Sequence, residues 1–183
     1  MASTEGVASV STGQPELDKK MGGGIPIGSL VLLEGQSDSG KSVVSQQLMW
    51  GSLQAGLTVT LFTTENTTKS LLRQMSSLNL EVMEFLLLGR LKIYPISVGK
   101  NKLTPKQVFD TILRNISHGP RVDLIVIDSL TTFVTRGSWE DTAAYFEECQ
   151  VLVGEARTSS MWRLPTPSTT RRWPDSDQCV TPT

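Results

Sequence analysis

The sequence has little of what marks secreted, membrane-spanning or metal-binding chains. Its 183 residues include one histidine and two cysteines, Cys149 and Cys179, which lack metal-ligand spacing. Apolar runs such as 85–88 and 124–127 are far shorter than the ~20 residues that cross a bilayer. The N-terminus has neither the basic start nor the apolar run of a secretion signal. We therefore expect a cytoplasmic protein whose membrane association, if any, runs through a partner.

Charge and length limit the partners and the number of domains that we expect. Lysine and arginine number 17 against 18 acidic residues, for a formal net charge of −1. A protein that binds nucleic acid or an anionic membrane through a dense basic surface has a different balance, so no nucleic acid is expected as a partner. The length fits one ordinary domain.

Short apolar or branched runs alternate with segments of helical spacing along most of the chain. Such alternation indicates right-handed crossovers between parallel strands. The sequence therefore predicts an α/β fold, with a mainly parallel sheet flanked by helices. The expected strands are 30–34, 58–64, 91–95 and 122–128, and the expected helices are 41–55, one from 66 or 67 to about 75, 81–88, 105–118 and 138–155.

A phosphate-binding loop follows the first of these strands and precedes a helix. Its residues match the pattern G-x-x-x-x-G-K-[ST] in full. Backbone N–H groups of such a loop and the positive end of the next helix point at phosphates, while the lysine reaches the β and γ phosphates and the hydroxyl binds Mg²⁺. We predict that ATP or a similar nucleotide binds here with Mg²⁺. The loop consists of Gly35, Gln36, Ser37, Asp38, Ser39, Gly40, Lys41 and Ser42.

Two acidic residues at the ends of expected strands complete the candidate site. Asp128 closes the apolar run 124–127, which puts a carboxylate at the edge of the sheet where α/β proteins bind ligands. We expect it to hold the Mg²⁺ shell together with Ser42, through a bound water. Glu65 closes the strand after the phosphate-loop helix and is the candidate catalytic base that polarises the attacking water. An ordinary capping or surface role is the alternative for each.

The residues around these motifs resemble those of a known family. The stretch 11–29, with its glycine run 22–24 before the phosphate loop, resembles the KaiC-type ATPases of the RecA superfamily. The stretches 64–68 and 127–131 are similar to the FlaH (ArlH) family of accessory ATPases of the archaeal flagellum, or archaellum. The resemblance covers about residues 10–156. It implies a RecA-like core and a ring-forming or ring-docking cytoplasmic protein, which works with the motor ATPase and a membrane-anchored scaffold.

One departure from the KaiC pattern bears on activity. KaiC-like ATPases usually carry two adjacent glutamates where this chain has Glu65 followed by Asn66. An amide cannot act as a base, so efficient hydrolysis is in doubt. The sequence leaves open whether the chain is an enzyme. We expect nucleotide occupancy to regulate assembly, with slow turnover.

Three other functions remain open at this stage. A KaiC-type signalling kinase would transfer phosphate to its own serine or threonine. A RecA or RadA-type DNA-dependent ATPase would need basic loops after Asp128, and residues 131–148 contain only one basic residue, Arg136. A scaffold that works without nucleotide is the third.

The chain changes character after residue 156. Residues 159–183 hold four of the nine prolines and two of the four tryptophans, without helical or strand periodicity. We therefore expect a flexible leader at 1–10, an incomplete ATP-binding domain at 11–156 and an atypical tail at 157–183. The tail is read as disordered or as the product of a frameshift near Thr158, which an intact alternative reading frame in the gene would reveal.

Overall fold

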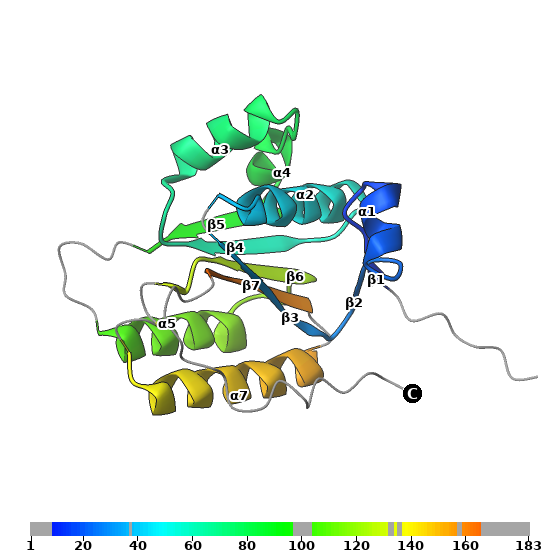
Figure 1. The fold of residues 1–183 in the computed structure, drawn as a ribbon. Coiled ribbons are helices and arrows are strands. Elements are labelled where there is room, and N and C mark those ends of the chain that lie inside the picture. Colours follow the sequence, from blue (N-terminus) through cyan, green and yellow to red (C-terminus); the bar gives the residue numbers. More distant parts are fainter. Residues whose placement is uncertain are drawn as a thin grey trace, which may run out of the picture.

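The fold is a parallel sheet between two layers of helices, which confirms the α/β class (Figure 1). The computed structural model describes residues 9–36, 38–96, 104–131, 134, 137–156 and 159–165, with 154–165 as backbone only. The strands are β3 (Leu30–Gly35), β4 (Val59–Thr63), β5 (Leu91–Pro95), β6 (Leu124–Asp128) and β7 (Ser159–Pro165). They lie in the order β3-β7-β6-β4-β5, and every pairing among them is parallel.

The helices divide between the two faces of this sheet. One face carries α2 (Lys41–Gln54), α3 (Thr68–Ser77) and α4 (Met83–Leu87), and the other carries α5 (Pro105–His118) and α7 (Trp139–Ala156) (Figure 1). None of the helices among the described residues is both long and apolar enough to span a bilayer.

Capping side chains set where several helices begin, as their sequences predict. Thr104 and Gln107 form a capping box at the start of α5, and Pro105 takes the first helical position. The hydroxyl of Thr67 accepts from the backbone N–H of Ser70 at the start of α3. The Ser138 hydroxyl accepts from the N–H of Asp141 at 3.0 Å before α7.

The central strands are buried on both faces, and their side chains alternate between two apolar cores. Leu124 and Val126 of β6 belong to the core under α2, α3 and α4, whereas Ile125 and Ile127 belong to the core under α5 and α7. Cys149 of α7 lies in the second core, where burial raises the pKa of its thiol to about 12. This cysteine therefore contributes packing rather than reactivity.

The strand β7 corrects the expectation for the C-terminal segment. Residues 159–165 were expected to form no strand, but they lie at the centre of the sheet between β3 and β6. The prediction was wrong because this segment has no apolar pattern of its own. Its strand structure depends on pairing with the two neighbouring strands, β3 and β6. Residues 166–183 lie outside the described residues, so the frameshift interpretation stays a prediction.

The segment before the phosphate-loop strand forms a small unit, in which a short helix ends before the glycine run as the sequence predicts, but two short strands were not expected. Strands β1 (Ser9–Val10) and β2 (Ile25–Pro26) pair antiparallel on either side of α1 (Pro15–Lys20). Val10 is fully buried, so the expected leader at 1–10 extends two residues too far. Residues 1–8 lie outside the described part of the chain.

Asp18 is the polar centre of this unit. Its carboxylate accepts hydrogen bonds from the Ser11 hydroxyl at 2.5 Å and from the N–H and hydroxyl of Thr12 at 2.8 and 2.7 Å. The Gln47 amide of α2 donates to the Thr12 carbonyl at 2.9 Å. The bonds therefore join the N-terminal unit to the helix that follows the phosphate loop.

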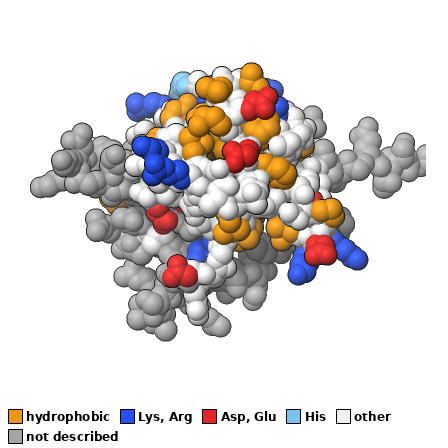
Figure 2. All heavy atoms as spheres, turned by 90° about the horizontal axis from the view of Figure 1, so that it is seen from above, with side chains coloured by type: hydrophobic (Ala, Val, Ile, Leu, Met, Phe, Trp, Pro, Cys, Tyr) orange, Lys and Arg blue, Asp and Glu red, His pale blue; other side chains and the backbone are white. Residues whose placement is uncertain are grey.

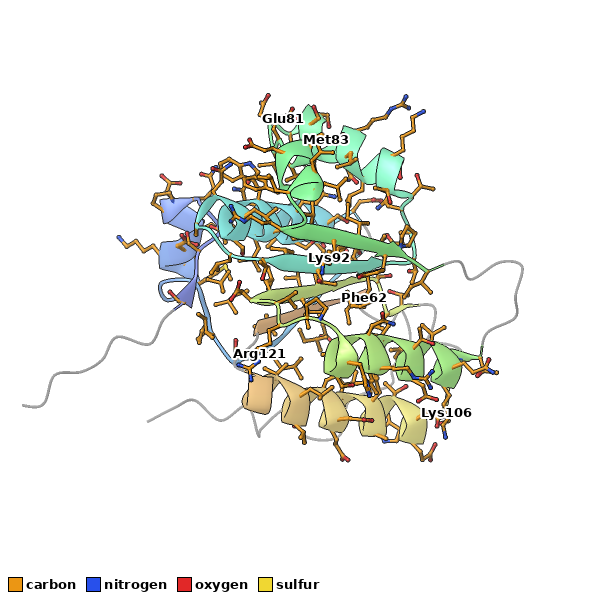
Figure 3. All side chains as sticks on the ribbon, turned by 180° about the vertical axis from the view of Figure 1, so that it is seen from behind. Phe62, Glu81, Met83, Lys92, Lys106 and Arg121 are labelled. Atoms are coloured by element: carbon orange, nitrogen blue, oxygen red, sulfur yellow. The ribbon has the colours of Figure 1, made fainter. Side chains whose placement is uncertain are left out.

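Apolar side chains are also exposed at the outer end of the α3 and α4 layer. Leu87 is 80% and Leu88 64% exposed, and Met83 and Leu78 are 49% and 38% exposed. Figure 2 views this layer from above and shows apolar side chains interspersed with acidic ones, and Figure 3 labels Glu81 and Met83 there. This surface is therefore accessible to another molecule.

We predict that Asp18→Asn lowers the free energy of unfolding at neutral pH by about 1 kcal/mol, because an amide accepts these partly exposed bonds more weakly than a carboxylate. Burial opposes ionisation of Asp18, but its hydrogen bonds from Ser11 and Thr12 outweigh burial and lower the pKa below its ordinary value of 3.8. The stabilisation is present above that value and is lost as the pH falls through the lower folded pKa. Urea unfolding of both proteins at decreasing pH should therefore show a shrinking difference.

The control for this experiment is Glu16→Gln, on the exposed side of the same helix. It should leave stability almost unchanged at every pH. A difference between Asp18→Asn and the wild type that stayed constant into acid would contradict the role given to the Asp18 carboxylate.

Candidate nucleotide-binding site

The phosphate loop lies between β3 and α2, and two glycines allow its shape. A Cβ on Gly35 would stand 2.6 Å from the Ser39 hydroxyl oxygen, a separation that requires a shift of one of them. Gly40 has a φ of +86°, in the left-handed region that side chains disfavour. Asp38 also has a positive φ, of 60°. The loop is therefore tightly curved, and of its predicted residues only Ser37 lies outside the described chain.

The side chain of Lys41 is hydrogen-bonded to other residues of this loop. Its side-chain ammonium donates to the carbonyl of Gly35 at 2.7 Å, to the carbonyl of Gln36, and to the Ser39 hydroxyl at 3.3 Å. Lys41 is 8% exposed. A buried positive charge within a loop of backbone groups is well suited to an anionic ligand, whose oxygens can replace the loop acceptors.

The start of α2 differs from the starts of α3 and α5. No side chain caps α2 at Gly40, whereas threonines cap the other two helices. The first N–H groups of a helix lack acceptors within the helix and carry partial positive charge. This helix start is therefore suited to an anionic ligand such as a phosphate.

Asp128 lies at the same edge of the sheet as the loop. Ile127 pairs with Trp162 of β7, and Trp162 pairs with Leu32 of β3. Asp128 is thus separated from β3 by two strand spacings, or about 10 Å. Its carboxylate is 2% exposed.

The oxygen donors at this edge fit Mg²⁺. Ser42 offers a hydroxyl in the first turn of α2, and Asp128 offers a carboxylate. Mg²⁺ prefers oxygen ligands and usually binds one or two protein groups together with waters and substrate phosphates. The described residues hold no group of three or more histidine, cysteine or acidic side chains that could bind a metal ion.

Glu65 follows β4, the neighbour of β6. Thr63 pairs with Asp128 in the sheet, and the Ser129 hydroxyl donates to the Glu65 carboxylate at 2.7 Å. The side chain of Asn66 instead accepts from the Ser70 hydroxyl of α3 at 3.1 Å. Glu65 rather than Asn66 is therefore bonded to the strand end that carries Asp128. The sequence reading missed Ser129, although its position directly after Asp128 was a usable signal.

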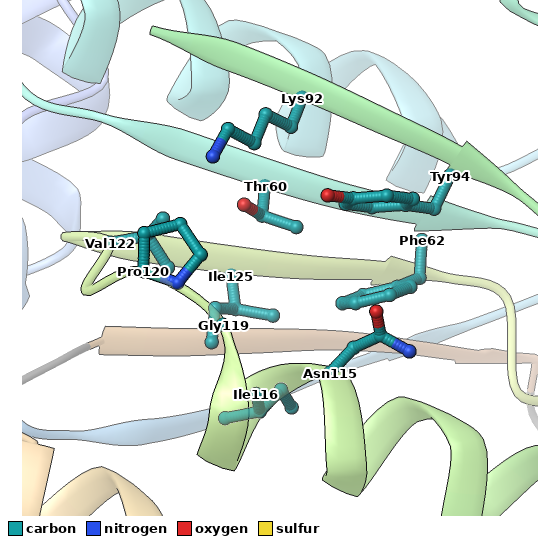
Figure 4. A pocket seen from close by; sticks show the side chains of 10 residues that line it. All are labelled: Thr60, Phe62, Lys92, Tyr94, Asn115, Ile116, Gly119, Pro120, Val122 and Ile125. Carbon is teal, nitrogen blue, oxygen red and sulfur yellow. The ribbon is translucent and has the colours of Figure 1, made fainter. Parts of the chain in front are cut away.

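A separate hollow on the α5 side of the sheet is too small for a nucleotide. It has room for about 50 Å³, well below the ~300 Å³ of the smallest usual ligand sites. Phe62 of β4 and Tyr94 of β5 stack at its wall, and Lys92 points in from the edge strand (Figures 3 and 4). Its other lining residues are Thr60, Asn115, Ile116, Gly119, Pro120, Val122 and Ile125.

The parallel sheet, with its phosphate loop after one strand and Asp128 after another, defines the class of a P-loop protein with the RecA-type fold. A family model for the ATPase KaiC matches residues 10–156. The chain belongs to this KaiC family of ATPases. For such a protein a bound nucleotide, typically with Mg²⁺, is the implied ligand.

Individual relatives agree with this assignment. The archaeal flagellar ATP-binding protein FlaH of Methanocaldococcus jannaschii is 33% identical over 153 residues, which are 80% of this chain and 64% of that protein. The protein of the same name from Sulfolobus acidocaldarius is 30% identical over 151 residues, or 81% and 65%. The chain thus spans slightly less than two thirds of the length of these relatives.

A solved structure shows the same fold. The crystal structure of the flagellar accessory protein FlaH from Methanocaldococcus jannaschii matches with a TM-score of 0.71 and 30% sequence identity. The match covers 87% of this chain and 71% of that one. The chain is therefore homologous to FlaH over most of its described part.

We predict that Lys41→Ala weakens ATP binding by about ten- to a hundredfold, because a hydrogen bond to a charged group contributes about 1.5 to 3 kcal/mol. Titration of a fluorescent ATP analogue in the presence of Mg²⁺ measures the affinity. Lys20→Ala, which removes an exposed lysine of α1, is the matched control and should bind as the wild type does.

Thermal melting should show that both variants are folded. If wild type and folded Lys41→Ala bound ATP with equal affinity, the phosphate loop would not be part of the binding site.

Proposed function

We propose that this chain is an ATP-binding accessory protein of the archaeal flagellum motor, in which nucleotide occupancy regulates assembly and hydrolysis is slow. The similarity to FlaH supports the motor role. The observation that carries the binding site is the buried ammonium of Lys41 inside the loop, beside the uncapped start of α2.

In this proposal the phosphate loop binds the β and γ phosphates through backbone N–H groups and Lys41. Ser42 and Asp128 would hold Mg²⁺, Asp128 through water, and a bound ion would supply positive charge beside the phosphates. Glu65 accepts a proton from the attacking water while the water oxygen bonds to the γ phosphorus. The bond from that phosphorus to the ADP oxygen breaks at the same time, which gives ADP and inorganic phosphate.

Slow turnover follows from the residues next to Glu65. The neighbouring position holds an amide, Asn66, which is bonded to Ser70 of α3 and cannot take a proton. A single carboxylate therefore serves the attacking water. Bound ATP would then persist long enough to act as a signal for assembly.

The proposed partners are the motor ATPase and the membrane-anchored scaffold of the archaellum, with a ring of several copies of this chain as the assembled form. This assigns the protein to the cytoplasmic side of the membrane, attached through its partners. The exposed side chains of Leu87 and Leu88, at the C-terminal end of α4, offer apolar contact area on the layer opposite α5 and α7. None of these contacts requires the chain itself to insert into the bilayer.

We expect the protein to co-sediment with the motor ATPase of the same organism when Mg²⁺ and a non-hydrolysable ATP analogue are present, and less with ADP. In this proposal the γ phosphate connects the residues at the end of β3 with those at the end of β6. ADP lacks that phosphate and therefore leaves the two strand ends unconnected. Steady-state phosphate release should stay below about 1 per second, the low end of common enzyme rates.

Lys41→Ala should lose the nucleotide effect on co-sedimentation, and Lys20→Ala should keep it. Association that ignored nucleotide would contradict the regulatory role. Rapid turnover stimulated by single-stranded DNA would favour a RadA-type ATPase instead.

A further inference from the structure

The Glu65 carboxylate is hydrogen-bonded to Ser129, the residue that follows the neighbouring strand β6. The Ser129 hydroxyl donates to Glu65 Oε1 at 2.7 Å, across a separation of 64 residues in the sequence. Glu65 itself is exposed, whereas Ser129 is 2% exposed. The bond therefore joins a buried donor to an exposed carboxylate.

Ser129 is fixed because Thr64 binds it from both sides. The Thr64 hydroxyl donates to the Ser129 carbonyl at 3.0 Å and accepts from the Ser129 N–H at 3.4 Å. The Thr64 N–H also donates to the carbonyl of Asp128 at 2.9 Å. These bonds hold the backbone of the residue after β6 against the residue after β4, so the Ser129 hydroxyl extends from a fixed backbone position.

We propose that Ser129 is a positioning residue that orients the Glu65 carboxylate toward the water that attacks the γ phosphate. This inference rests on the proposed function, in which Glu65 is the base. One carboxylate oxygen accepts from Ser129, and the carboxylate thereby has a defined orientation in which to take the proton. Since Ser129 directly follows Asp128, the same strand end sets the position of the base and of the Mg²⁺ carboxylate.

Ser70, which bonds to Asn66 next to Glu65, has a different role. Ser70 donates to Asn66 Oδ1 at 3.1 Å and to the Thr67 carbonyl at 3.0 Å, and both acceptors directly precede α3. These bonds of the Ser70 hydroxyl therefore shape the helix start. Ser70→Ala is a matched control, because it removes a hydroxyl from the same junction and leaves the Ser129 bond in place.

The test is a single-turnover assay with radiolabelled ATP, Mg²⁺ and the full chain in excess. Ser129→Ala should slow phosphate release about ten- to a hundredfold, the usual effect of losing a group that orients a ligand or base. Ser129→Thr, which keeps the hydroxyl, should restore most of the rate, and Ser70→Ala should match the wild type. In each variant the affinity for ATP should be unchanged.

A double-mutant cycle separates positioning from a general structural effect. Ser129→Ala should have no further effect on the rate in a Glu65→Gln background, because the base it orients is already gone. Equal rates for wild type and Ser129→Ala, or an equal slowing in the Glu65→Gln background, would overturn the inference. So would a wild type that binds ATP without any turnover, whereas a wild type that fails to bind ATP would overturn the proposed function itself.

Discussion

The pairing of β4 with β6 is the constraint on which the site depends, and side chains fasten it at both ends. At the amino end, the N–H and hydroxyl of Thr58 both donate to the Asp123 carboxylate at 2.8 Å. At the carboxyl end, Thr64 exchanges hydrogen bonds with Ser129. A slip of this pairing would move Asp128 and the Glu65 carboxylate out of register, because successive side chains point to opposite faces of a strand.

The strand β7 sets the distance between the phosphate loop and Asp128. It lies between β3 and β6, so the phosphate loop and Asp128 approach one another across its carboxyl end rather than along adjacent strands. A gap of about two strand spacings has room for a phosphate and a hydrated ion. The separation of the phosphate loop from Asp128 therefore depends on the pairing of the segment that follows α7.

Local signals in the sequence predicted most of what surrounds the site. The Thr104 cap, the buried run of β6 and the phosphate loop each depend on neighbouring residues, so the α/β class was predictable. Contacts between distant segments were not. The bond from Ser129 to Glu65 and the pairing of β7 with β3 depend on how strands assemble, which has no counterpart in local residue spacing.

The proposed function requires that the phosphate loop, Lys41 and the ends of β4 and β6 form a single nucleotide site. A crystal structure with Mg²⁺ and a non-hydrolysable ATP analogue would show whether they do. We expect the Lys41 ammonium to contact β and γ phosphate oxygens in place of loop carbonyls, with the ion between Ser42 and Asp128. An analogue bound elsewhere, with Lys41 still on the carbonyls of Gly35 and Gln36, would contradict it.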